Sequence, residues 1–423
     1  MKRIPEEYIH YIWQYGLYDQ VGLRTTEGLE IEILKRGFHN SQSGPDFTDV
    51  RLKLGEQEWV GHVEIHYRSK DWYDHGHQYD PAYNNVILHV VLTHDIEVRT
   101  QSGGVPPTLS LAQRFSIDHF RHYDSFITSK TWVPCEKEMA QIGRLKVIDV
   151  LDRMISERLE QKSQRFLEEL ERCQGNWEQV VFMSLAMAMG AKVNAEPFRV
   201  LTLITPLEVI KKHRDDPFIL EALFLGQAGF LTEPMDDHAR RLSKEYDFLK
   251  HKYGLQAMTK VTWKLAPVRP ASAPQVRIVQ LSRLFHGTAN LFSLLLEGSL
   301  KDMHDAFDIN LDGYWQDHHS LAKPSKPQIK RIGQDVRNSL FINVAAVLRF
   351  SYAIQQEKQL FKDSAVSLLE TIPSEENTII RKWREIGVQA ENAMDSQALI
   401  QLKREHCDKR KCLTCSIGKE ILK

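Results

Sequence analysis

The stretch Trp59-Val-Gly-His-Val-Glu-Ile-His-Tyr67 carries three polar side chains, His62, Glu64 and His66, at intervals of two residues. Because successive side chains of a β-strand point to opposite faces, this pattern predicts a strand with all three on one face and hydrophobic residues on the other. Burying a carboxyl group and two imidazoles costs desolvation free energy, which a metal ion or a hydrogen-bonded catalytic cluster usually offsets. We therefore expect the chemistry of this protein at this strand.

Strand-like segments continue on both sides of this stretch, separated by Gly, Asn, Asp and Ser turns. They are residues 30–34, 47–54, 58–67, 86–92 and 96–99, and they follow a helix expected over residues 5–15, with Pro5 in its first turn. This combination predicts an α/β domain over residues 1–134.

Helical periodicity dominates the rest of the chain. In residues 147–173, for example, apolar side chains recur at steps of three and four residues, which is typical of an amphipathic helix. We expect an all-helical domain over residues 135–423, with a Pro-rich break near 263–277 that can divide its helices into two groups.

The composition is that of a globular protein. Of the 423 residues, 42% are hydrophobic and 26% are charged, and the net charge is -1, which excludes a disordered or strongly polybasic chain. A chain of this length is expected to form two or three domains. No apolar run is long enough to span a bilayer and the first residues lack the core of a signal peptide, so we expect a cytoplasmic protein.

The order of motifs in the first domain resembles the PD-(D/E)xK nuclease superfamily. Gly44-Pro-Asp46 is followed eighteen residues later by Glu64 and His66, and then by a short segment with Gln78 and Tyr83 before an apolar strand. The resemblance implies an α-β-β-β-α-β, restriction-endonuclease-like core with a mixed sheet. It also implies that Asp46 and Glu64 hold Mg²⁺ or Mn²⁺, and that His66 occupies the position of a lysine.

Two further site residues follow from the same resemblance. Tyr83 would lie on the segment that contacts DNA in many of these nucleases, and Glu7 is the best candidate for an acid on the upstream helix. The implied activity is metal-dependent hydrolysis of a nucleic-acid phosphodiester, because two carboxylates on neighbouring strands can hold a divalent ion and leave positions open for water and phosphate. Imidazole lacks the permanent charge of lysine, so the substitution by His66 bears on activity more than on fold.

Other interpretations of the same residues remain open. Six histidines, His62, His66, His75, His77, His89 and His94, fall within 33 residues, and with Glu64 they could bind Zn²⁺, Mn²⁺ or Fe²⁺ in a metal hydrolase. Alternatively, the domain is a non-catalytic module that binds nucleic acid or protein. In a purely structural interpretation, Asp46 caps a turn, Glu64 pairs with Arg51 or Arg68, and the histidines are ordinary core or surface residues.

A cysteine cluster near the C-terminus predicts a second metal site. Cys407, Cys412 and Cys415 form a C-x₄-C-x₂-C pattern, and tetrahedral zinc or a [4Fe–4S] cluster needs a fourth ligand. Cys135 is the expected fourth ligand and His406 the alternative, so that the metal would dock the C-terminal tail onto the junction between the two domains. We interpret Cys173, at the end of a predicted helix, as a buried apolar thiol.

The pattern also bears a loose similarity to helicase-associated and CRISPR-adaptation nucleases that carry a four-cysteine iron–sulfur cluster. In those enzymes one cysteine precedes the nuclease core, whereas all four follow it here.

Several short motifs along the chain together resemble an uncharacterised bacterial domain-of-unknown-function family. They include Gly44-Pro-Asp-Phe47, Gly61-His-Val-Glu-Ile-His66, Pro134-Cys-Glu136, Phe224-Leu-Gly-Gln-Ala-Gly229 and Cys412-Leu-Thr-Cys415. This resemblance spans nearly the whole chain and implies a bacterial cytoplasmic protein, but it implies no activity.

Overall fold

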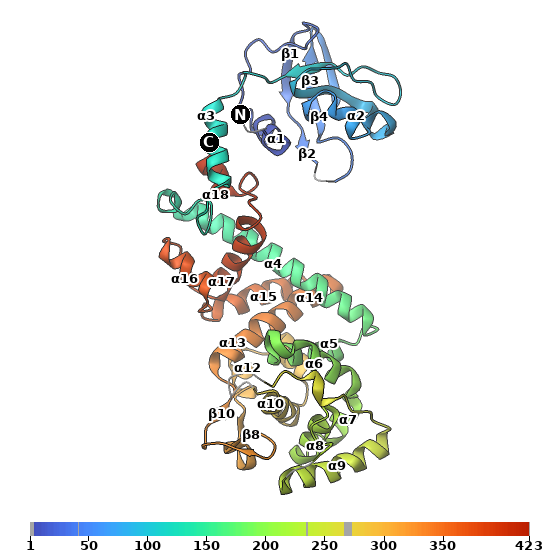
Figure 1. The fold of residues 1–423 in the computed structure, drawn as a ribbon, viewed down its shortest axis with the longest axis vertical. Coiled ribbons are helices and arrows are strands. Elements are labelled where there is room, and N and C mark those ends of the chain that lie inside the picture. Colours follow the sequence, from blue (N-terminus) through green and yellow to red (C-terminus); the bar gives the residue numbers. More distant parts are fainter. Residues whose placement is uncertain (1–3, 41, 234–235, 266–272, 423) are drawn as a thin grey trace. The chain divides into compact units, whose positions relative to one another are not determined.

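The computed structural model describes residues 4–40, 42–233, 236–265 and 273–422 (Figure 1). The chain forms two compact units, of which the first is made from two separate parts of the sequence. Unit 1 comprises Met1–Val147 and His406–Lys423, and unit 2 comprises Ile148–Glu405.

A mixed β-sheet forms the centre of unit 1. Its strands are β1 (Ile31–Lys35), β2 (Phe38–His39), β3 (Phe47–Leu54), β4 (Gln57–Arg68), β5 (Val86–Thr93) and β6 (Thr108–Ser110). They lie in the order β1-β3-β4-β5-β6, and β2 also pairs with β3. The pairs β1–β3 and β3–β4 are antiparallel, whereas β4–β5 and β5–β6 are parallel.

The connections on either side of β4 follow from the local sequence. A tight turn joins β3 to β4 at Gly55, whose positive φ of 60° is favourable for glycine. The parallel return to β5 needs a crossover, which is supplied by α2 (Asp71–Asp74), η1 (His77–Tyr79) and η2 (Pro81–Asn85). The apolar strand β5 is buried over all but its last residue, as expected for a strand covered on both faces.

Helices complete unit 1. They are α1 (Glu6–Tyr15), α3 (Ile117–Ile127), the single turn η3 (Met139–Gln141) and, from the C-terminal tail, α18 (Ser416–Ile421). Helix α1 buries Ile9, Ile12 and Trp13 completely and packs against β4. It ends at Gly16, which adopts the left-handed conformation common after helices.

Two expectations for this region are wrong in detail. Residues 96–99 do not form a strand; Val98 alternates with exposed neighbours because it packs against Trp72, not because it joins the sheet. The boundary expected at residue 134 falls inside unit 1, which continues to Val147 and takes up residues 406–423. The change from strand-like to helical pattern marks a change of secondary structure, and it does not mark the end of a compact unit.

Unit 2 is largely helical. Its helices are α4 (Arg144–Arg172, which starts in unit 1), α5 (Trp177–Met189), α6 (Ala191–Ile204), α7 (Leu207–His213), α8 (Pro217–Gln227), α9 (Asp237–Tyr253), α10 (Pro274–Gly287), α11 (Leu291–Glu297), α12 (Leu300–Ala306), α13 (Gln334–Leu340), α14 (Ala346–Gln356), α15 (Gln359–Thr371), α16 (Thr378–Glu385) and α17 (Ala393–Gln401). The described residues also include the π-helical segments η7 (Phe341–Ala345) and η8 (Leu402–Cys407, which ends in unit 1) and the 3₁₀ turns η4 (Lys260–Thr262) and η6 (Gly313–Gln316).

The second domain is therefore not all-helical as expected. Between α12 and α13 the chain forms two small antiparallel pairs, one of β7 (Asn310–Leu311) with β10 (Lys330–Arg331) and one of β8 (His318–Ser320) with β9 (Lys323–Pro324). Their sequence is rich in polar residues, Gly and Pro, which gives no helical period.

Part of the Pro-rich break predicted near 263–277 lies outside the described residues, since these omit 266–272. The described chain resumes in α10, where Pro274 occupies the first helical position. Among the described residues, every helix is too short or too polar to cross a lipid bilayer.

Candidate functional site

Strand β4 carries the predicted polar face. Glu64 and His66 are buried at 4% and 1% relative exposure, and His62 is half-buried. Val63 and Ile65 are buried on the opposite face, so the alternation inferred from the sequence is present. Both faces of this stretch are covered, which keeps the polar groups out of bulk water.

The carboxylates of Asp46 and Glu64 each accept a hydrogen bond from a backbone N–H in the segment that carries the other acid. The Asp46 N–H donates to Glu64 Oε2 at 3.0 Å, and the Ile65 N–H donates to Asp46 Oδ2 at 2.9 Å. The start of β3 and the middle of β4 therefore bring both predicted metal ligands to one place. Asp46 is about one-fifth exposed, with a side-chain value of 21%, so solvent reaches this end of the cluster.

Imidazoles surround His66 and the Glu64 carboxylate. His66 Nδ1 lies 2.9 Å from His89 Nε2 on β5, and His66 Nε2 lies 3.1 Å from His75 Nδ1. His77 Nε2 lies 3.0 Å from Glu64 Oε1, and His66 Nε2 lies 3.6 Å from the same oxygen. Among the described residues, His66, His75 and His77 offer ligand atoms that all lie within 4.8 Å of one another.

The sheet register explains how distant histidines meet. Glu64 on β4 is paired with His89 on β5, and in a sheet paired side chains share a face. His75 and His77 come from the crossover segment between these two strands. His62 and His94 are not part of the three-histidine group, and His94 Nδ1 instead lies 2.9 Å from Ser69 Oγ.

Helix α1 contributes His10, which the sequence reasoning missed. His10 Nε2 lies 3.2 Å from Asp46 Oδ2, and Glu6 Oε1 accepts a hydrogen bond from the Tyr67 N–H. Glu7, the acid expected from this helix, is exposed and is not brought to the cluster. The sequence could have predicted this position, because Glu6, His10 and the buried Trp13 are spaced by four and three residues and therefore lie on one face of the helix.

Tyr83 has a supporting position. Its ring stacks on His77 with centroids 3.9 Å apart, and it meets the buried ring of Trp72 edge to face at 5.8 Å. Tyr83 is only 7% exposed, so it fixes the His77 imidazole and does not present a free surface to DNA.

The groups described around Glu64 are imidazoles and a second carboxylate, so none of them carries a permanent positive charge. Burial and the neighbouring Asp46 carboxylate raise the pKa of Glu64 far above its ordinary value. Burial and the adjacent imidazoles hold the pKa of His66 well below its ordinary range, and burial lowers the pKa of His89 to about 3. Burial opposes protonation of His10 as well, but its interaction with Asp46 raises its pKa overall.

The purely structural interpretation fits these contacts poorly. Arg68, offered as a partner for Glu64, instead lies 3.5 Å from Asp71, and Arg51 is exposed. The neighbours of Glu64 are imidazoles. Moreover, His62 Nδ1 and His89 Nδ1 are buried atoms that have no hydrogen-bond partner among the described residues.

The four cysteines predicted to bind a metal line one small cavity in unit 1, together with His406. All five cysteines of the chain are described, and none forms a disulfide. Burial and the nearby thiols of Cys415 and Cys412 raise the pKa of Cys135 to about 12. Cys173 lies just after α4 in unit 2 and is half-buried, not buried as expected.

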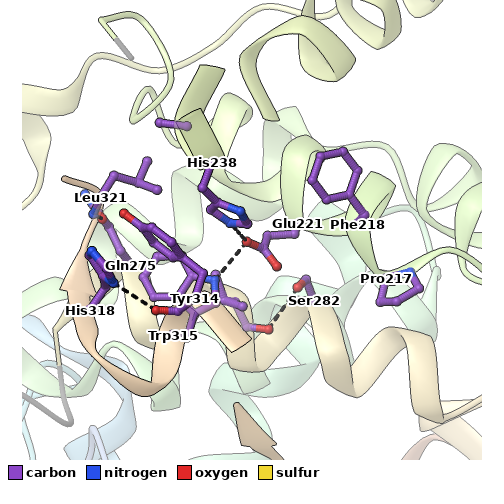
Figure 2. Close-up of polar contacts among 12 residues, drawn as sticks. Pro217, Phe218, Glu221, His238, Gln275, Ser282, Tyr314, Trp315, His318 and Leu321 are labelled. Carbon is purple, nitrogen blue, oxygen red and sulfur yellow. Dashed lines mark hydrogen bonds and ion pairs between the residues drawn. The ribbon is translucent and has the colours of Figure 1, made fainter. Parts of the chain in front are cut away.

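A second buried carboxylate lies in unit 2. Figure 2 shows His238 and Trp315 converging on Glu221 of α8, with Nε2 and Nε1 at 2.9 and 2.8 Å from Oε1. Arg283 Nη2 donates to the other oxygen at 2.8 Å. The His238 ring stacks on Tyr314 at 4.1 Å. This cluster joins α8, α9, α10 and η6, and both oxygens of Glu221 have partners.

The fold and site define a protein with a mixed α/β unit that holds a buried carboxylate–imidazole cluster, and with a larger helical unit. The chain belongs to the family described as protein of unknown function (DUF2851), whose model matches residues 6–378. The matched residues include the whole carboxylate–imidazole cluster and end before Cys407. No curated protein and no solved structure matches the chain.

Proposed function

We propose that unit 1 hydrolyses nucleic-acid phosphodiesters with a divalent cation held by Asp46 and Glu64. The observation that carries the proposal is the reciprocal arrangement of these two carboxylates, each accepting a backbone hydrogen bond from the segment of the other. Burial and the neighbouring Asp46 carboxylate make ionisation of Glu64 costly, and a divalent cation held by both acids would offset that cost.

The topology of unit 1 supports the same proposal. If the short β2 is set aside, its elements run α1, β1, β3, β4, α2 and β5, which is the α-β-β-β-α-β order of PD-(D/E)xK nucleases. The two acids stand at the start of the second core strand and in the middle of the third, as in that superfamily. The order of elements is an analogy of fold, whereas the contacts of Asp46 and Glu64 are specific to the chain.

The surrounding donors fit a divalent ion. The imidazole of His10 lies beside Asp46, and those of His66 and His77 lie beside Glu64. Nitrogen ligands bind Mn²⁺, Fe²⁺ and Zn²⁺ better than Mg²⁺. When bound, such an ion supplies charge neutralisation and Lewis-acid activation at the scissile phosphate. Asp46 and Glu64 are the residues that would hold it.

His66 takes a different role from the lysine that it replaces. It stays neutral near pH 7, because burial and the neighbouring imidazoles lower its pKa. It therefore cannot act as a fixed cation, but its ring is oriented by His89 and can exchange hydrogen bonds through Nε2. His66 would orient a water molecule, and it would not neutralise phosphate charge.

A second candidate is a metal hydrolase whose ion is bound mainly by histidine. The specific observation in its favour is the group of His66, His75 and His77, with all ligand atoms within 4.8 Å of one another. Such a nitrogen-rich site suits Zn²⁺, Mn²⁺ or Fe²⁺.

The test is hydrolysis of single- and double-stranded DNA and RNA by the full chain with Mg²⁺, Mn²⁺, Zn²⁺ or Fe²⁺. We expect Asp46→Asn and Glu64→Gln each to lower the rate about a thousandfold or more, since the metal contributes several kcal/mol to transition-state stabilisation. Glu58→Gln is the matched control, because Glu58 lies exposed at the start of the same strand.

The outcomes separate the candidates. Equal cleavage by the wild type and Glu64→Gln would assign the activity to a contaminant and sink the proposal. Loss of activity in His75→Ala and His77→Ala, with Asp46→Asn fully active, would instead favour the histidine-bound ion.

A further inference from the structure

The C-terminal tail returns to unit 1 and is fixed there by several contacts. Arg410 donates to the Ser129 carbonyl at 2.8 Å, and His119 on α3 is hydrogen-bonded to the Leu422 carbonyl. The Lys419 ammonium lies 5.2 Å above the ring of Tyr15. Residues distant in sequence by more than 270 positions therefore meet within one compact unit.

These contacts bring the cysteine-rich turn of the tail to Cys135. Cys135, Cys407, Cys412 and Cys415 line the same cavity, whose volume is about 20 Å³, with His406 beside them. A space of that size accommodates about one water-sized species. Cys135, Cys407 and Cys412 are buried.

The backbone places two of these cysteines at the ends of one turn. Among the described residues no three of the four sulfurs lie within 4.8 Å of one another, so a bound ion would draw them closer together. The Cys415 N–H donates to the Cys412 carbonyl at 3.3 Å, which closes a turn with both cysteines at its ends. At Gly418 an added Cβ would lie 2.2 Å from the Cys412 carbonyl oxygen, so any larger residue would push α18 away from the turn. Such C-x₂-C turns are typical of thiolate sites for metals.

We propose that Cys135, Cys407, Cys412 and Cys415 bind one thiolate-liganded metal centre that fastens residues 406–423 to unit 1. Zn²⁺ and a [4Fe–4S] cluster share this ligand chemistry, and a cavity of about 20 Å³ favours the single ion. The four cysteines line one cavity although they come from both ends of the unit, and four thiolates are the ligand set of a structural metal centre. The role is structural, and the centre is separate from the proposed catalytic ion.

The first experiment is analysis of zinc, iron and acid-labile sulfide in the anaerobically purified full chain, together with its visible absorption. We expect either about one zinc per chain or about four irons with sulfide and visible absorption. Cys412→Ser and Cys415→Ser should lose this metal, whereas Cys173→Ser and Asp46→Asn should retain it. Unchanged metal content in the two tail variants would overturn the proposal.

A second measurement uses the wild type alone and therefore applies even if the cysteine variants do not fold. In the wild type, thiol labelling followed by mass spectrometry should find Cys173 reactive and the other four cysteines protected until a chelator removes the metal. Chelation should also release hydrogen-exchange protection in residues 117–135 and 406–422, with α8 and α10 unchanged. Protein that contains no metal, takes up none, and labels all five cysteines alike would refute the proposal, as would a disulfide among the four.

Discussion

Glu64 in unit 1 and Glu221 in unit 2 are both buried glutamates with histidine and tryptophan nearby, yet their surroundings differ in one decisive respect. Glu221 accepts a hydrogen bond from the Arg283 guanidinium, which is always charged. Glu64 has imidazoles and a second carboxylate as its neighbours. A buried carboxylate with a permanent cation is already neutralised, whereas one without it is suited to bind a cation from solution.

The largest difference should appear when each glutamate is removed. Glu221→Ala leaves Nη2 of the half-buried Arg283 and the buried Trp315 N–H without their acceptor, and we expect it to lower the free energy of unfolding of unit 2 by about 3 kcal/mol or more. At pH 5, Glu64→Gln should change the metal-free stability of unit 1 by less than about 1 kcal/mol, because the native carboxyl is protonated there and the unfolded one is only partly ionised.

Hydrogen exchange of peptides from each unit separates the two effects. Glu208→Ala, at an exposed position on α7, is the control for general effects of losing a surface charge. An equally large loss in Glu64→Gln would mean that Glu64 holds the fold together in the same way as Glu221.

Addition of Mn²⁺ should stabilise unit 1 and leave unit 2 unchanged. At a free concentration 100 times the Kd, binding to the folded state adds about 2.7 kcal/mol to the free energy of unfolding. Protection of β4 and β5 against hydrogen exchange should rise in the wild type and stay constant in Glu64→Gln. An equal rise in protection in Glu64→Gln would show that Mn²⁺ binds somewhere other than at Glu64.

The pH dependence of the metal-free protein sharpens the comparison further. The pKa of Glu64 rises from an ordinary 4.5 to about 9 in the folded state, so the folded state binds more protons between these values. Its contribution to stability is therefore lost as pH rises through this window, by up to about 1.4 kcal/mol per pH unit.

The measurement is the difference in unfolding free energy between the wild type and Glu64→Gln at pH 5, 7 and 9. We expect the variant to become the more stable of the two as pH increases. Parallel pH profiles would contradict a raised pKa for Glu64.

The smallest effect is expected at Tyr83. Its ring supports His77 by stacking, so Tyr83→Phe keeps that contact and should alter the hydrolytic rate less than about threefold, whereas Tyr83→Ala should lower it by about ten- to a hundredfold. Steady-state rates with a DNA substrate test both variants. A large effect of Tyr83→Phe on KM alone would restore the expected contact between its hydroxyl and nucleic acid.

The sequence predicted the centre of unit 1 because short-range periodicity determines it. The period of two in β4 gave both the strand and the inward face of Glu64 and His66, and the turn at Gly44-Pro45 gave Asp46. His75 and His77 could equally have been solvated loop residues, since their approach to His66 depends on the crossover between β4 and β5.

Contacts across long separations in the sequence were harder to infer. His10 reaches Asp46 only because α1 packs on the sheet, and Glu7 on the same helix points elsewhere. The cysteine motif predicted a metal site with Cys135 as the fourth ligand, and Cys135 lines the same cavity as the three tail cysteines. The inclusion of residues 406–423 in unit 1 could not be predicted, because no short stretch of sequence encodes it. The small β pairs of unit 2 were missed because strands of two or three residues are too short to show a period.

The return of residues 406–423 to unit 1 has a consequence for how the chain is made. Ribosomes add about 5–20 residues per second, so the 258 residues from Ile148 to Glu405 take about 13–50 s to translate. During that time the sheet of unit 1 has been synthesised, yet its last segment does not exist. Until then the surface of unit 1 that receives the tail, at α3, Ser129 and Cys135, stays exposed on the growing polypeptide.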